Sequence, residues 1–324
     1  MTSTDVKDEE GKPTDKPIEH ECGLILQKVK VTAQLPQNIL ENVELRAAAD
    51  SEIEIIKQIL NGNSRTGNVE YYFENEHVKD EKNFYEPRRL TRNEWRYYVL
   101  EEKGFGDTLR LIDLLSNISD TPLDCSKLRT VEGGITYSPA RLANLMDISH
   151  PSMPVYEISE GAISQIKELC DTYYRIENAK LKSEILRGLT LFDDLGSLPT
   201  HSHFIVIGLF AIFELLLTHQ PELKDSSDSI SHQLRKKMNL MSNRFDSDID
   251  YKRFFGGVDH TSLWNALYKY RSLVAHGSAT DFNSKDLKVL KNAQNANDFL
   301  TNVLRLLFRQ CLKEPQLAAD LKLC

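Results

Sequence analysis

An arginine and a histidine stand close together near the end of one candidate helix. Residues 268–277 read Tyr-Lys-Tyr-Arg-Ser-Leu-Val-Ala-His-Gly, which separates Arg271 from His276 by four residues. The guanidinium group is a permanent cation, and imidazole is the side chain that ordinarily titrates nearest to neutral pH. A cation that stabilises negative charge and a group that transfers protons suit the cleavage of a phosphodiester without a metal. Arg271 and His276 are therefore the first candidates for catalytic residues, although the same pair is also common at ordinary helix ends.

The helix predicted over residues 261–276 has two distinct faces. At about 100° per residue, one face is an apolar stripe typical of a core contact. It consists of Leu263, Leu267, Tyr270 and Val274. The other face holds Tyr268, Ser272 and Ala275, and its borders are Arg271 and His276, about 140° apart. Gly277 is expected to end the helix, because glycine readily takes the left-handed conformation.

The second face predicts a groove at a subunit interface. Its small side chains, Ser272 and Ala275, leave room for a ligand or another helix. One chain supplies a single imidazole of this kind, whereas acid–base cleavage of a phosphodiester needs two proton-transfer groups. A symmetric dimer would bring two copies of the pair together.

A lone carboxylate interrupts the most apolar segment of the chain. Residues 202–219 are apolar almost all round, which predicts a helix in the middle of a bundle, and Glu214 lies within it. A buried carboxylate is costly unless it is protonated or paired with a cation. We expect Arg271 to be that cation. The pair would then support catalysis or serve as a structural ion pair.

Basic residues gather near the Arg-His pair although the whole chain has a net charge of −8. Residues 156–324 hold equal numbers of basic and acidic side chains, so residues 1–155 carry the acidic excess. The candidates for contacting a phosphate backbone are Arg235, Lys236, Lys237 and Lys269. A solvated helix face explains them equally well.

The sequence divides into three parts. Residues 1–21 are acidic and lack apolar clusters, which predicts a disordered tail. Residues 22–150 mix strand and helix patterns and predict a smaller α+β domain of unknown role, followed by a linker near residues 148–154. Residues 155–324 predict an all-α bundle. Its expected helices cover residues 159–177, 181–195, 202–219, 229–245, 261–276 and 284–313.

Other patterns predict neither a metal nor a cofactor. His201 and His203 lack a nearby third ligand. Asp246, Asp248 and Asp250 lack the glycine and the closing glutamate of a calcium loop, and they indicate a polar turn. The five cysteines are scattered without metal or disulfide spacing, which favours reduced thiols and a cytoplasmic protein. The longest apolar run is too short to cross a bilayer, so no membrane contact is expected.

Residues 270–277, with Arg271 and His276, resemble the Arg-x4-6-His signature of HEPN domains, specifically the Apea-like group. Residues 186–194 and the apolar run 204–217, with Glu214, resemble the two preceding helices of that group. The resemblance covers roughly residues 155–315 and does not reach the N-terminal domain. It implies a small helical bundle that forms a homodimer.

HEPN proteins with an intact signature are commonly metal-independent endoribonucleases of bacterial toxins and antiviral defence. The resemblance therefore implies RNA cleavage by attack of the 2′-hydroxyl, giving 2′,3′-cyclic phosphate and 5′-hydroxyl ends. His276 would be the acid–base group and Arg271 would stabilise the charged phosphorane. The family often has Asn, Asp or His after the arginine, where this chain has Ser272, which can still form a hydrogen bond.

Two alternatives remain at this point. One is a catalytically inactive HEPN-fold module that binds RNA or protein, with Arg271 and Glu214 as a structural pair. The other is an antitoxin-like or scaffolding protein that acts through the N-terminal domain. In each case the N-terminal domain is a candidate site for a regulatory partner.

Overall fold

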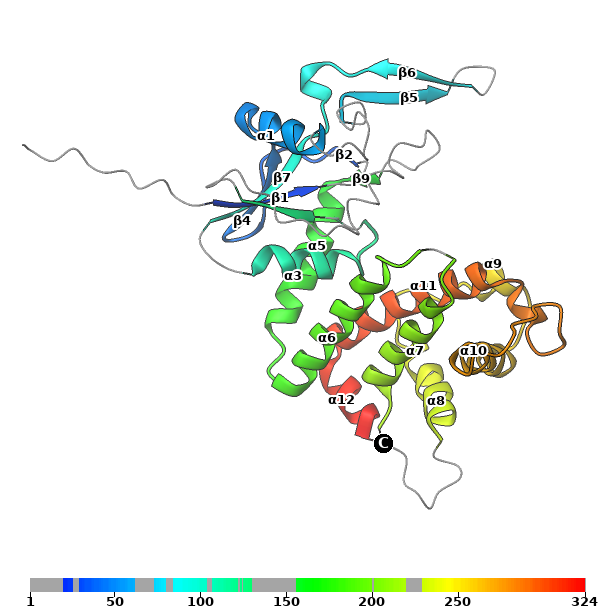
Figure 1. Cartoon of the computed structure of the whole chain (residues 1–324). Coiled ribbons are helices and arrows are strands. Elements are labelled where there is room, and N and C mark those ends of the chain that lie inside the picture. The colour runs from blue at the N-terminus through cyan, green and yellow to red at the C-terminus, as the bar shows by residue number, and fades with distance from the viewer. Residues whose placement is uncertain are drawn as a thin grey trace, which may run out of the picture.

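The computed structural model is mostly helical, with strands in its N-terminal part (Figure 1). It describes residues 20–25, 29–61, 73–79, 84–103, 107–121, 123, 125–129, 156–199, 201–219 and 229–323. The predicted linker at 148–154 and the first nineteen residues of the predicted tail lie outside this part of the chain. His20 and Glu21, which the sequence assigned to the tail, instead belong to the first strand.

An antiparallel sheet forms the centre of the N-terminal part, with strand order β3-β4-β7-β1-β8. Its strands are β1 (His20–Ile25), β3 (Gln37–Leu40), β4 (Val43–Ala47), β7 (Tyr98–Lys103) and β8 (Cys125–Arg129). Alternation along β4 buries Val43 and Leu45 and leaves Arg46 on the other face. There Arg46 pairs with Glu52 of α1 (Asp50–Asn61) and with Glu101 of β7.

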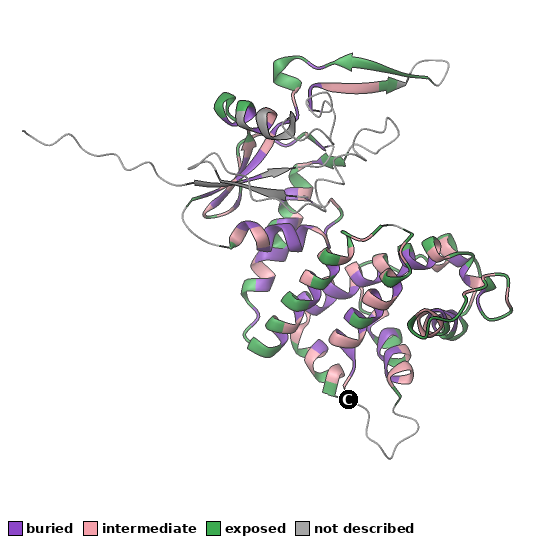
Figure 2. Cartoon of the chain, in the orientation of Figure 1, coloured by how far each residue is buried: buried purple, intermediate pink, exposed green. Residues whose placement is uncertain are grey.

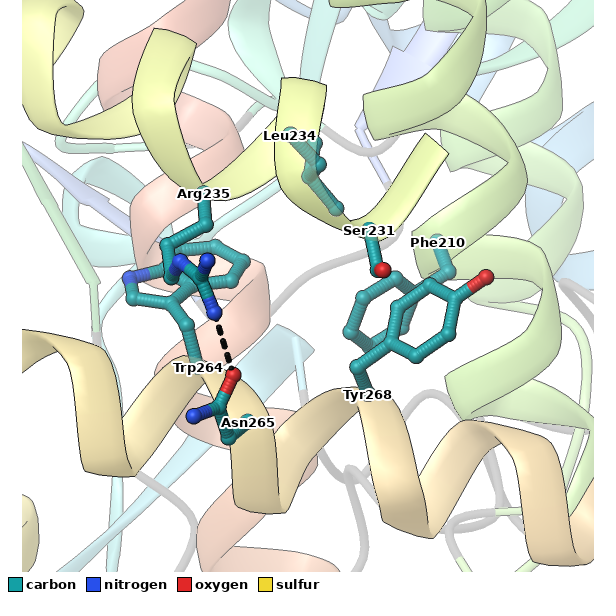
Figure 3. A pocket seen from close by; sticks show the side chains of 7 residues that line it. All are labelled: Phe210, Ser231, Leu234, Arg235, Trp264, Asn265 and Tyr268. Carbon is teal, nitrogen blue, oxygen red and sulfur yellow. Dashed lines mark hydrogen bonds between the residues drawn. The ribbon is translucent and has the colours of Figure 1, made fainter. Parts of the chain in front are cut away.

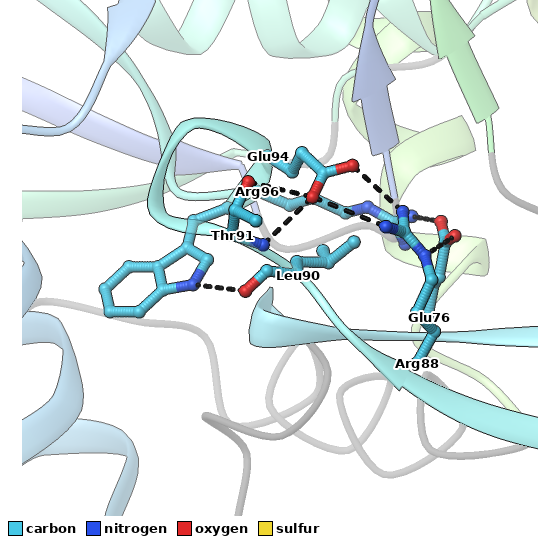
Figure 4. A network of polar contacts seen from close by, with 7 residues as sticks. Glu76, Arg88, Leu90, Thr91, Glu94 and Arg96 are labelled. Atoms are coloured by element: carbon cyan, nitrogen blue, oxygen red, sulfur yellow. Dashed lines mark hydrogen bonds and ion pairs between the residues drawn. The ribbon is translucent and has the colours of Figure 1, made fainter.

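A separate antiparallel hairpin, β5 (Asn75–Lys79) and β6 (Tyr85–Arg89), projects from the N-terminal part at the end far from the C-terminal helices (Figure 1). Charged side chains hold its base (Figure 4). Glu76 accepts hydrogen bonds from Arg88 at 2.7 Å and from Arg96 at 2.8 Å. Glu94, at the end of the 3-10 turn η1 (Arg92–Glu94), accepts from Arg88 and from the backbone of Thr91 at 2.9 Å. This network joins the hairpin to Glu94 and Arg96, which precede strand β7 of the sheet.

The helices of the C-terminal part surround α7 (Phe204–Leu217). This helix packs against α6, α8, α10, α11 and α12, and its Val206, Phe210 and Phe213 are completely buried. Figure 2 shows that buried residues run through the helices of this part of the chain. The expectation of a central apolar helix is confirmed. The other helices are α5 (Glu160–Tyr174), α6 (Ala179–Leu195), α8 (Ile230–Ser242), α9 (Tyr251–Phe255), α10 (His260–Ala275), α11 (Ala293–Lys313) and α12 (Pro315–Leu323).

Three helices differ from the sequence prediction. The last long helix begins at Ala293, not near residue 284, because the Asn292 side chain accepts a hydrogen bond from the Asn295 N–H and caps it there. The short 3-10 turn η2 (Lys288–Leu290) lies before it. The helices α9 and α12 were not predicted.

The two parts of the chain share one continuous apolar core. The short strand β9 (Tyr156–Ile158) pairs in parallel with β2 (Val29–Val31), so residues 156–158 complete the N-terminal side. Next, α3 (Thr108–Ser116) packs against α5 and α6. Asp193 on α6 accepts hydrogen bonds from Arg110 at 2.9 Å and from Asn117 at 3.0 Å. The buried cluster extends from the sheet through α3 into the helices.

Candidate active site

The end of α10 is built as the sequence predicted. His276 caps the helix, and Gly277 follows with φ of +65°. The N–H of Gly277 donates to the carbonyl of Val274 at 3.0 Å. The N–H of Ser278 donates to the carbonyl of Leu273 at 2.8 Å. This pair of bonds is the Schellman arrangement, which satisfies the last free carbonyls of the helix and fixes the backbone at His276.

The core stripe of α10 is confirmed. Leu263, Leu267 and Tyr270 are completely buried, and Val274 is partly buried against the same core. Trp264 is also buried and meets Phe213 of α7 edge to face, with ring centres 5.6 Å apart. These contacts fix the rotation of α10 about its axis and therefore the direction in which Arg271 points.

Arg271 pairs with Glu214 across the α7–α10 contact, as expected. Its Nη2 lies 3.3 Å from Oε1 of Glu214, and the side chains keep 26% and 21% of their exposure. The guanidinium carbon also lies 5.7 Å from the centre of the Tyr268 ring, one turn earlier on α10. The Arg271 Nε is buried, and no residue in the described part of the chain bonds to it. The cation is thus oriented and keeps unused donor capacity.

Burial raises the pKa of the Glu214 carboxyl above its ordinary value, and the neighbouring Arg271 opposes the rise. The direction shows that desolvation in the apolar helix outweighs the attraction of the guanidinium. Ionising a carboxyl group in this environment costs free energy, so its charged form depends on the neighbouring cation. Glu214 and Arg271 therefore act as one unit.

His276 occupies a different position from Arg271. It is exposed, while Ser272 and Tyr268 between them are partly buried and Ala275 is exposed. The His276 N–H donates to the carbonyl of Ser272 at 3.1 Å, which is a backbone contact of the helix end. Among the described residues, no side-chain bond joins His276 to Arg271 or to Ser272. One chain therefore presents the arginine and the imidazole on different sides of α10.

The predicted basic strip is only partly at the surface. Lys236 and Lys269 are exposed. Lys237 is 5% exposed, and its Nζ lies 3.4 Å from Nδ1 of His219 and from Oε1 of Gln233. Lys237 is therefore buried beside His219, which follows α7, and does not present its cation at the surface as the predicted RNA contact requires. No local pattern distinguishes Lys237 from the adjacent Lys236, which is exposed.

Arg235 lines a small hollow (Figure 3). The hollow has a volume of about 80 Å³ and lies between α7, α8 and α10. Arg235 donates to Oδ1 of Asn265 at 2.7 Å, and Phe210, Trp264 and Tyr268 supply aromatic walls. Because Tyr268 also contacts Arg271, the hollow adjoins the candidate site. The Arg235–Asn265 bond joins residues far apart in the sequence, so no local pattern could have indicated it.

The other sequence candidates lie apart from this site. His201 and His203 are exposed ahead of α7, and the described residues contain no group of side chains that could hold a metal. Asp246 forms an ion pair with Lys313, and Asp250 caps α9 by accepting from a backbone N–H at 2.9 Å. The three aspartates therefore form a polar turn, as predicted.

Comparisons with protein families, curated proteins and solved structures give no match to this chain. Within the ranges that the structure describes, no helix combines the length and apolar character needed to cross a membrane.

Proposed function

We propose that this protein is a metal-independent endoribonuclease of the HEPN type, with Arg271 and His276 as its catalytic residues. One observation carries the proposal. Glu214 orients Arg271 on the same helix whose capped end exposes His276, and this helix belongs to a bundle around an apolar central helix. An oriented cation and an exposed imidazole are the groups that phosphodiester transfer requires.

The reaction that these groups suit is intramolecular. The RNA 2′-oxygen forms a bond to phosphorus while the bond from phosphorus to the 5′-oxygen breaks. The proton of the 2′-hydroxyl passes to a base, and another proton reaches the departing 5′-oxygen. The products are a 2′,3′-cyclic phosphate and a 5′-hydroxyl, and Arg271 would stabilise the phosphorane charge.

A homodimer supplies the second proton-transfer group. Arg271 and His276 lie about 140° apart around α10, so they do not converge within one chain. A two-fold axis near the end of α10 would place His276 of one copy beside that of the other. In this assembly Lys269 and Lys236 contact RNA phosphates and Ser272 supplies a hydrogen bond. The N-terminal part recruits a regulatory partner in the cytoplasm of a cell that uses the enzyme as a toxin or for antiviral defence.

The partial burial of Arg271 favours a second candidate. Because its guanidinium already binds Glu214, Arg271 is equally suited to a structural role in an inactive module that binds RNA or protein. The two functions differ in what the loss of His276 does. In a structural module the loss of the exposed His276 side chain should change neither RNA binding nor stability.

Cleavage of a fluorescent single-stranded RNA in buffer with EDTA tests the proposal. We expect the wild-type chain to give fragments with 2′,3′-cyclic phosphate ends. His276→Ala and Arg271→Ala should each lower the rate at least about 100-fold, the usual scale for a lost acid–base or charge-stabilising group. His203→Ala is the matched control, because His203 is also an exposed histidine at a helix end.

Circular dichroism must show that each variant is folded. Full cleavage by a folded His276→Ala variant would contradict the catalytic assignment. RNA binding without cleavage, equal in wild type and His276→Ala, would instead support the inactive module.

A further inference from the structure

A second and larger cavity lies between α9, α11 and the loop that follows α3. Its volume is about 310 Å³. The charged side chains in its walls include Asp120 after α3, Arg253 on α9, and Arg305 and Arg309 on α11. None of them belongs to the candidate active site. Nothing in the proposed ribonuclease reaction uses this cavity.

Arg305 is a cation without a counterion in this cavity. Its Nε is buried without a hydrogen-bond partner, and no carboxylate in the described part of the chain forms an ion pair with it. Burial lowers the pKa of Arg305 from its ordinary value; Arg309 lowers it as well, while Tyr156 and Asp120 oppose the change. Guanidinium nevertheless stays protonated in proteins, so a positive charge is held here in a partly desolvated place.

Other arginines that are buried or partly buried differ from Arg305. Arg46, Arg96 and Arg271 have a carboxylate oxygen at 2.7, 2.8 and 3.3 Å. Arg235 has an amide oxygen at 2.7 Å. Taking a charge out of water costs free energy unless a partner compensates it. Arg305 lacks such a partner although it lines a cavity large enough to admit one.

The carboxylates that line the same cavity have other partners or are exposed. Asp120 accepts from Arg309 at 3.1 Å, and its other oxygen accepts from a glutamine of α5 at 3.1 Å. Asp250 caps α9 by accepting from the backbone N–H of Arg253 at 2.9 Å. Asp248 is exposed. The charge on Arg305 is therefore not neutralised by direct contact with this wall.

We propose that this cavity binds a small ligand through an oxyanion, either a phosphate or a carboxylate, that pairs with Arg305. The planar guanidinium can bind two oxygens of such a group at once. Apolar walls from Phe254, Val303 and Leu306 suit the carbon frame of the ligand, and the exposed Asp248 can accept from a hydroxyl or amino group. The volume lies at the lower end of ligand pockets, about 300–1,000 Å³.

The position of the cavity gives the ligand a structural effect. Asp120 belongs to the loop that follows α3, whereas Arg305 and Arg309 belong to α11 of the bundle. A ligand held between them contacts both parts of the chain and stabilises their packing. Binding should therefore raise the temperature of unfolding, which can be measured before the natural ligand is known.

Thermal unfolding of the full chain with inorganic phosphate or acetate, each against sodium chloride of equal ionic strength, tests the proposal. At least one of the two anions should raise the melting temperature of the wild type by about 3 °C near saturation. A shift in melting temperature with phosphate only, with acetate only or with both identifies the group that the site prefers. Arg244→Gln is the matched control, because Arg244 is an exposed arginine paired with Glu314, and it should respond as the wild type does.

Two variants of Arg305 decide the result. Arg305→Gln should abolish the anion-dependent shift and, without added anion, melt no lower than the wild type, because it removes an uncompensated charge. Arg305→Lys keeps the charge but lacks the planar group that binds two oxygens at once. It should therefore lower the affinity for the anion at least about 10-fold, measured by calorimetric titration. No shift with either anion, or an equal shift in a folded Arg305→Gln or Arg305→Lys variant, would overturn the proposal. These outcomes do not depend on ribonuclease activity.

Discussion

Single residues in the candidate site are coupled most strongly at the Arg271–Glu214 pair. Removing Arg271 leaves a carboxylate in an apolar helix where burial already raises its pKa. Breaking a fully buried pair costs about 3–5 kcal/mol, but these side chains are about one-quarter exposed, which lowers the cost. We expect Arg271→Ala to lower the free energy of unfolding by about 1–2 kcal/mol near neutral pH, measured by urea denaturation.

The pH dependence of this loss identifies Glu214 as its cause. A raised carboxyl pKa means that the folded state favours the protonated form, so stability is lost as pH rises from the ordinary glutamate value through the raised one. The penalty of Arg271→Ala should therefore vanish near pH 4 and grow toward pH 7. Adding Glu214→Gln to Arg271→Ala should restore most of the stability. A penalty that is the same at both pH values would show that lost packing of the arginine stem is responsible.

At the scale of elements, the end of α10 depends on the conformation of Gly277. Its φ of +65° is unfavourable for a residue with a Cβ, although a Cβ there would meet no atom within 4 Å. Gly277→Ala should therefore cost about 1 kcal/mol through backbone strain alone, measured by thermal unfolding. If the cap also positions His276, the rate of RNA cleavage should fall by more than the loss of folded protein explains.

Gly257→Ala is the matched control for this prediction. A Cβ at Gly257 also has open space around it, and its φ is outside the unfavourable region. The substitution should leave stability unchanged or raise it slightly, because alanine restricts the unfolded chain. An equal loss of stability in both variants would show that the left-handed conformation at Gly277 is not its cause.

The sequence predicted best those helices whose apolar spacing alone shows which face is buried. The apolar run of α7 and the stripe of α10 could be placed because each buries a face that is visible in the spacing. The short helix α9 has only five residues, too few to show periodicity. The start of α11 depends on the cap at Asn292, and asparagine is as common in turns as at helix starts.

The sequence predicted a contact within the candidate site only where one residue needs a partner of a particular charge. Glu214 within an apolar helix requires a cation, and Arg271 was the suitable one nearby. No such requirement shows which of Lys236 and Lys237 is buried, or that Arg305 has no counterion. Those properties arise from how α8 and α11 pack against other elements, which the sequence pattern does not specify.

The whole molecule is expected to unfold as one unit because its core is continuous. The helix α3 of the N-terminal part buries Leu115 completely and packs against α5 and α6. Removing the N-terminal part would expose the faces of α5 and α6 that α3 covers. Tests of its regulatory role should therefore use surface substitutions in the full chain, since a truncation would also change stability.

Leu115→Ala tests this cooperativity. Truncating a buried leucine costs about 2–5 kcal/mol, and in a continuous core the loss should reach both parts of the chain. The two tryptophans report on them separately, with Trp95 near the base of the hairpin and Trp264 on α10. Fluorescence of Trp95→Phe and Trp264→Phe backgrounds should show coincident urea transitions, both moved by Leu115→Ala to the same lower concentration. Leu240→Ala, at an exposed leucine, should move neither. A shift confined to the Trp95 signal would mean that the N-terminal part unfolds independently, and the shared core would not couple it to the helices that hold Arg271 and His276.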